Sequence, residues 1–130
     1  MPQLVKGGKW VFGWCVVGPA GEIKIPPGAY QEYGFVPGED VIITRGSRRS
    51  GGFGLGRQEK LANSPLLSRF HGRATIGAAG QVVLPAETGL QPGEHLLAVH
   101  GSGLALGFVQ RGPIYEEALK HSEIETFESI

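Results

Sequence analysis

Apolar residues recur along this chain in short runs that predict β-strands rather than long helices. The segment Glu22–Ile25 alternates polar and apolar side chains with a period of two, which is typical of a half-buried strand. The apolar runs Val41–Ile43 and Leu96–Val99 predict buried strands, and mixed strands are expected at Phe53–Arg57 and Leu104–Val109. Glycine and Pro-Gly turn signals separate these segments, so we expect many short strands joined by tight turns.

The strand pattern occurs twice. Gly21–Pro26 (GEIKIP) matches Gly80–Pro85 (GQVVLP) at an offset of 59 residues, and Gly34–Glu39 (GFVPGE) matches Gly89–Glu94 (GLQPGE) at an offset of 55. In both copies an apolar run, a glycine turn and another mixed strand follow in the same order. We interpret the chain as two copies of one unit that cannot bury its apolar strands alone.

This repeat predicts a single domain over residues 1–130. Its predicted parts are repeat one at about 10–57, a polar linker at 58–73 with a short helical piece near Leu66, repeat two at about 74–110, and a C-terminal helix and tail at 111–130.

The two ends of the chain add further expected elements. Trp10, Phe12 and Trp14 are spaced two apart in an N-terminal strand and are expected on one face, either in the core or as an aromatic strip for a protein partner. Pro113 and the apolar spacing that follows it predict a C-terminal helix. The acidic tail from Ser122 onward is expected to fray.

The composition is that of a globular protein, with 41% apolar and 18% charged residues and 22 glycines in 130 residues. A single cysteine, Cys15, excludes an internal disulfide and is expected to be a buried, inert thiol. The start, MPQLVKGGKW, has no apolar run after its first lysine, and no stretch approaches the roughly 20 apolar residues of a membrane span. We therefore expect a soluble cytoplasmic protein with no membrane partner.

The charges are unevenly distributed although the net charge is zero. Residues 43–73 contain seven basic residues and one glutamate, a net charge of +6, whereas residues 74–130 contain two basic residues and seven glutamates, a net charge of −5. This asymmetry predicts one face that attracts polyanions.

No residue pattern predicts catalysis, a metal or a cofactor. The four histidines, His71, His95, His100 and His121, are not clustered at ligand spacing, and His95 and His100 are expected on opposite faces of one strand. The glycine-rich segment Gly51–Arg57 lacks the following helix and the Lys-Ser/Thr pair of a phosphate-binding loop. We therefore expect a protein that is not an enzyme.

The run GEIKIPP…YGFVPGEDVII, from Gly21 to Ile43, resembles the AbrB/MazE/SpoVT family, whose SpoVT-AbrB domain is a swapped-hairpin barrel. The resemblance covers about residues 16–57 and, in a degraded form, residues 74–110. In that family two β-β-α-β units interleave into one barrel, usually as a homodimer. The resemblance implies an all-β fold with short helices, in which this chain supplies both units as an intrachain pseudo-dimer.

The resemblance also implies a DNA-binding transcriptional regulator or an antitoxin-type protein. In the family, basic residues on the first strands and adjoining loops contact DNA. At those positions this chain has Lys24 but also Glu22, Gln81 and Val83, and residues 74–110 contain no lysine or arginine. Two equal basic halves are therefore not expected.

Arginine side chains are the best candidates for a contact with double-stranded DNA, because a guanidinium group can donate two parallel hydrogen bonds to one phosphate. The candidate DNA-binding residues are Lys24, Arg45, Arg48, Arg49, Arg57, Arg69 and Arg73. The alternative is that the basic loop at residues 45–52 is only a solvated hairpin tip.

Two functions are therefore weighed. The first is an AbrB-like regulator that contacts DNA phosphates through basic loops of repeat one, with the hypothesis that the acidic tail folds over the basic face and weakens binding. The second, favoured by a second copy without lysine or arginine, is a barrel without DNA binding that acts as a protein-interaction or small-ligand module. A protein partner and assembly into a homo-oligomer are left open.

Overall fold

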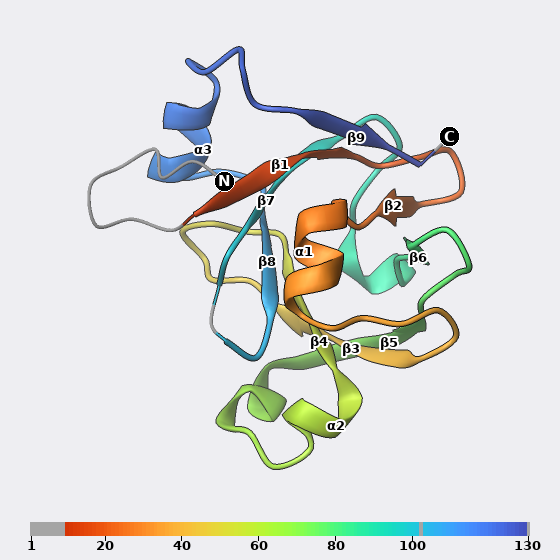
Figure 1. Cartoon of the computed structure of the whole chain (residues 1–130). Coiled ribbons are helices and arrows are strands. Elements are labelled where there is room, and N and C mark those ends of the chain that lie inside the picture. Colours follow the sequence, from red (N-terminus) through yellow and green to blue (C-terminus); the bar gives the residue numbers. More distant parts are fainter. Residues whose placement is uncertain (1–9, 102, 130) are drawn as a thin grey trace.

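The computed structural model describes residues 10–101 and 103–129 (Figure 1). The strands are β1 (Val11–Val16), β2 (Glu22–Lys24), β3 (Asp40–Arg45), β4 (Phe53–Arg57), β5 (Phe70–Thr75), β6 (Gln81–Val83), β7 (His95–Val99), β8 (Leu106–Val109) and β9 (Thr126–Glu128). The helices are α1 (Pro27–Glu32), α2 (Gln58–Leu61) and α3 (Pro113–Ala118), with the 3-10 helices η1 (Pro65–Arg69) and η2 (Ala86–Thr88). The prediction of a β-rich fold with short helices is confirmed. Within the described ranges, no helix has the length and apolar character needed to cross a membrane.

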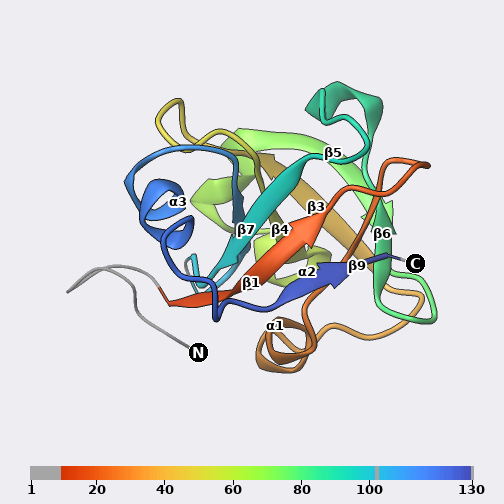
Figure 2. The same ribbon diagram turned by 90° about the horizontal axis from the view of Figure 1, so that it is seen from above.

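Seven strands form one sheet in the order β5-β3-β4-β8-β7-β1-β9, and β2 pairs with β6 in a separate ribbon (Figures 1 and 2). All pairings are antiparallel except that of β1 with β9. The edge strands β5 and β9 do not pair with each other, so the ladders of the described residues leave this sheet open rather than closed into a barrel.

The first strand of each repeat pairs with the other repeat. β1 runs against β7 with Cys15 opposite Leu96, and β5 runs against β3 with Ala74 opposite Val41. Cys15 and Ala74 are equivalent in the sequence repeat at the offset of 59 residues, and Val41 and Leu96 are equivalent at the offset of 55. The two residue pairs are therefore equivalent to each other. The two repeats are thus related by a pseudo-two-fold axis, and each completes the sheet of the other.

Two ladders lie on this pseudo-two-fold axis. In the β2–β6 ribbon Ile23 lies opposite Val82, and in the β4–β8 ladder Gly54 lies opposite Gly107. Because each of these residues faces its own repeat counterpart, both ladders join the repeats directly to one another.

Repeat two begins earlier than the sequence pattern indicates. We predicted a linker up to residue 73, but β5 starts at Phe70, and only α2 and η1 lie between the repeats. Leu66, expected in a short helical piece, lies in η1. The sequence of β5, FHGRAT, shares little with that of β1, VFGWCV, beyond the glycine at the equivalent position, so the copy was not recognised.

The prediction that the N-terminal aromatic residues share one face is wrong, because β1 contains a β-bulge. The register shifts between Val11 and Gly13, and an extra residue of this kind reverses the side to which the preceding side chains point. Trp14 therefore packs in an outer cluster, whereas Phe12 packs against the main core with its ring 6.5 Å from that of Tyr33. Trp10 is 45% exposed, so the three residues do not form one strip.

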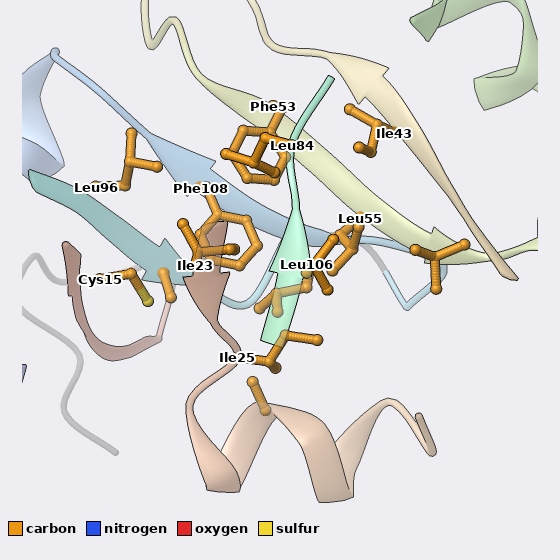
Figure 3. Packing of buried hydrophobic residues seen from close by; sticks show 14 of the residues in the cluster. Cys15, Ile23, Ile25, Ile43, Phe53, Leu55, Leu84, Leu96, Leu106 and Phe108 are labelled. Atoms are coloured by element: carbon orange, nitrogen blue, oxygen red, sulfur yellow. The ribbon is translucent and has the colours of Figure 1, made fainter. Parts of the chain in front are cut away.

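The main core lies between the β2–β6 ribbon and the inner face of the sheet (Figure 3). Phe53 of repeat one stacks on Phe108 of repeat two with ring centroids 4.6 Å apart. Ile23 and Val82 of the ribbon are fully buried beside them. Because each wall of this core contains strands of both repeats, the core forms only when both repeats are in place. Cys15 lies in the same core, and burial raises the pKa of its thiol to about 12, consistent with an inert thiol.

The outer face of the sheet has two separate covers. On the half containing β3 and β4, Leu61 of α2 is fully buried over Gly56, where an added Cβ would lie 2.6 Å from the Leu61 Cδ1 atom. On the half containing β7 and β1, Ala118 of α3 packs with Trp14 and Leu97. Figure 2 shows α3 beside these strands.

The C-terminal segment follows a different path from the one expected. The predicted C-terminal helix is confirmed as α3, but the tail adds a strand, β9, which pairs in parallel with β1 instead of fraying. Since α3 and β9 both pack on the β7–β1 half, the hypothesis that the tail folds over the basic face is wrong.

The adjacent valines of β6 test the shared core. Val82 is fully buried and Val83 is 58% exposed. We expect Val82→Ala to lower the free energy of unfolding by about 2 kcal/mol, because it removes buried methyl groups and leaves a cavity. Val83→Ala should change it by less than about 0.5 kcal/mol. Urea unfolding followed by tryptophan fluorescence measures both, and equal effects would contradict this account of the core.

Candidate nucleic-acid interface

The loop between β3 and β4 is held against the end of β8. Gly52 N donates to Gln110 Oε1 at 3.1 Å, and the backbone nitrogens of Gln110 and Arg111 donate to Ser50 O at 2.8 and 3.0 Å. Gly51 and Gly52 have φ values of +64° and +66°, a left-handed conformation that favours glycine. The base of this loop is therefore held in place, whereas Ser47, Arg48 and Arg49 at its tip are exposed.

This docking places three arginines together. Arg48 and Arg49 are exposed on the turn, and the guanidinium group of Arg111 donates to Arg48 O from Nη2 at 3.0 Å and from Nε at 3.3 Å. Arg111 was not among the predicted residues. It lies 63 residues from Arg48, and only the pairing of β4 with β8 brings it to this loop.

Three further arginines gather where β3 meets β5. Arg69 Nε donates to Arg45 O at 3.1 Å, and Arg45 donates from its Nη atoms to Phe70 O and Ser68 O at 3.3 and 3.4 Å. The guanidinium carbon of Arg73 lies 5.0 Å from the centre of the Phe70 ring, within the range of a cation–π contact.

We call these six residues the arginine surface. Its members are Arg45, Arg48, Arg49, Arg69, Arg73 and Arg111. All six are exposed, and in the part of the chain that the structure describes none has a carboxylate within ion-pair distance. Their charges are therefore available to an external anion.

Two predicted residues lie apart from this surface. Arg57 is half-buried, and its guanidinium group pairs with Glu39 at 3.1 Å and Glu59 at 3.2 Å, so its charge is already compensated. Lys24 lies on β2, on the side of the molecule opposite the β3–β4 loop (Figure 1).

The pseudo-two-fold counterparts of Arg73 and Arg45 are not cationic surface residues. The residue equivalent to Arg73 is Trp14, whose ring meets that of Tyr115 at 5.1 Å under α3, and the residue equivalent to Arg45 is His100. His100 packs on the side of Phe12 and Tyr33, whereas His95 packs against Trp14, which confirms that the two histidines lie on opposite faces. The candidate interface is therefore one-sided.

His121 links α3 to the segment that follows it; together they form the C-terminal cover of the outer face. His121 Nδ1 lies 2.8 Å from Glu123 Oε1, and its Nε2 lies 3.3 Å from Glu117 Oε1. Hydrogen bonds to these carboxylates raise the pKa of His121. The hydrogen bond to the imidazole lowers the pKa of Glu117, and a backbone hydrogen bond, together with the one to the imidazole, lowers that of Glu123. Among the residues placed by the structure, no group of three or more His, Cys, Asp or Glu side chains is arranged to hold a metal ion.

Comparison with known proteins gives little further information. No family model and no curated protein matches the chain. The solution structure of PHS018 from Pyrococcus horikoshii is 23% identical over 79% of this chain and 98% of that chain, with a TM-score of 0.42. A similarity at this level carries no argument about function.

The His121 contacts predict a pH dependence of the C-terminal cover. The raised pKa of His121 stabilises the cover below pH 6.5, and this contribution is lost as the pH rises through the raised value. The lowered pKa values of Glu117 and Glu123 stabilise the cover above pH 4.5. This stabilisation is lost as the pH falls through the lowered pKa values. We therefore expect the cover to be held most firmly between pH 4.5 and 6.5.

Hydrogen-exchange protection of the α3 amides, corrected for intrinsic exchange, measures this effect. His121→Ala should remove the pH dependence, and His71→Ala, which changes a half-buried histidine bonded to Glu87 O, should retain it. Wild-type protection that does not change between pH 5.5 and 8 would show that the link contributes nothing.

Proposed function

We propose that this chain is a DNA-binding transcriptional regulator of the AbrB-like type, with two swapped-hairpin repeats joined in one polypeptide. It contacts the phosphate backbone of double-stranded DNA through the arginine surface. The observation that carries the proposal is two groups of three exposed arginines, each drawn from segments far apart in the sequence and without a carboxylate partner among the described residues. The β3–β4 loop connects the two groups, because its Ser47 and Ser50 line one cavity together with Arg45 and Arg69.

The local chemistry suits phosphate oxygens. Guanidinium groups donate two parallel hydrogen bonds to a phosphate, and those of Arg48 and Arg49 extend from a loop whose backbone is already fixed. Contacts of this kind position a protein on the duplex and supply affinity that falls with salt, but they do not read the base sequence.

The exchange of first strands supports the family part of the proposal. Swapped-hairpin units would pair the first strand of one unit with the other unit, which is the arrangement of β1 on β7 and β5 on β3. An antitoxin-type regulator would use the same DNA contact.

A module without DNA binding is the second candidate. The position equivalent to Arg73 favours it, because Trp14 is buried there under α3 and the arginines lie on only one half of the molecule. A protein partner or a small ligand would then take the place of DNA.

The experiment is fluorescence anisotropy with a mixed-sequence DNA duplex, titrated with salt. We expect wild-type binding to weaken steeply as salt rises, because each neutralised phosphate releases counterions. The double variant Arg48→Ala/Arg49→Ala should bind more weakly and should reduce the slope of log K against log salt by about 2.

Lys24→Ala is the matched control, because it removes a cation from the opposite side of the molecule. It should bind as the wild type does. Loss of binding in Lys24→Ala alone would move the interface to β2, and no binding by the wild type at low salt would exclude the regulator.

A further inference from the structure

We propose that a cavity on the outer face of the sheet binds a small organic anion, with a phosphate or carboxylate head and a body the size of one ring. The cavity has a volume of about 270 Å³ and lies where β4 and β8 pair, between the two covers of the outer face. This ligand site goes beyond the proposed DNA contact and does not depend on it.

Two glycines lie at the floor of the cavity. Gly54 and Gly107, which lie opposite each other on the pseudo-two-fold axis, both line it. A Cβ atom at Gly54 would lie 2.5 Å from Thr44 Oγ1, and one at Gly107 would lie 3.1 Å from Val99 Cγ2. Glycine at these positions therefore lets the side chains of Thr44 and Val99 lie close against the sheet, where they form part of the cavity lining.

A threonine hydroxyl is open to the cavity. Thr44 lines the cavity, and its Oγ1 atom lies over Gly54. Among the described residues this oxygen makes no hydrogen bond, and it is accessible, because every side-chain N or O atom that is closed off from solvent has a partner. The pseudo-two-fold counterpart of Thr44 is Val99, so the strand itself does not require a hydroxyl at this position. A polar atom of a ligand in the cavity can therefore bond to Thr44.

The rim of the cavity is cationic. Arg45 and Arg69 both line it, and Ser47 and Ser50 add hydroxyl groups from the β3–β4 loop. Arg69 uses only its Nε atom in bonding Arg45 O, so its two Nη atoms have no partner among the described residues. These atoms can donate to a phosphate or carboxylate head.

The remaining walls are apolar. Leu66, Val99 and Val109 line the cavity around the glycine floor. Its volume of about 270 Å³ is near the lower end of small-molecule sites, which begin at roughly 300 Å³, and therefore suits one ring with a charged head. Since Arg45 and Arg69 also belong to the arginine surface, a bound anion would lower the charge presented to DNA.

The test uses phenyl phosphate and inorganic phosphate as probes, with no DNA present. In 1H–15N NMR titrations we expect phenyl phosphate to shift the amide signals of Gly54 and Gly107, and to bind about tenfold more tightly than inorganic phosphate because its ring buries apolar surface. Thr44→Val, which removes the hydroxyl at constant shape, should weaken phenyl phosphate about tenfold. Thr126→Val, an exposed threonine on β9, should leave it unchanged.

Phenyl phosphate that binds no better than inorganic phosphate, or that shifts signals elsewhere, would overturn the proposal. If Thr44→Val does not fold, Arg69→Ala is the second variant, and unchanged phenyl phosphate binding in it would overturn the proposal equally. Loss of DNA binding in the anisotropy experiment would leave this result untouched. Addition of phenyl phosphate to the DNA titration then tests whether the two anions compete for Arg45 and Arg69.

Discussion

In this molecule the first strand of each repeat pairs with the third strand of the other repeat: β1 pairs with β7, and β5 pairs with β3. This exchange determines where the core forms. The inner face of the exchanged sheet is closed by a ribbon with one strand from each repeat, in which Ile23 faces Val82. A single repeat would have neither the complete sheet nor the complete ribbon, so the folding of one half requires the other.

The same exchange leaves a sheet whose outer face has two halves, one for each repeat. Two unrelated segments of the chain cover these halves. The linker places Leu61 over repeat one, and the C-terminal segment places α3 over the strands that contain Trp14 and Leu97. The glycine-floored cavity is the seam between these covers, and the arginine surface borders it on the linker side. Both proposed sites therefore follow from how the outer face is divided.

The sequence was sufficient for the repeat, the C-terminal helix and the strands other than β5 and β9, because alternation and proline-glycine signals mark them locally. It was insufficient for the start of repeat two at Phe70, since β5 has lost the apolar pattern of β1, and for the side of Phe12, since a bulge reverses it. For the candidate site, composition indicated a cationic region. Only tertiary contacts show that Arg57 does not belong to the candidate site, because it pairs with Glu39. They also show that Arg111 does belong to it, because it follows β8 and bonds to the β3–β4 loop.

The covalent link between the repeats has a consequence for symmetry. In a homodimer of swapped units, every substitution appears at two places, so the two faces must remain alike. Here Arg73 and Trp14 occupy equivalent positions on exchanged strands, yet one lies on the exposed arginine surface and the other is buried beneath α3. A tandem chain can keep a symmetric interior while each exterior half changes independently, which allows a one-sided ligand surface that an exact two-fold assembly would have to duplicate.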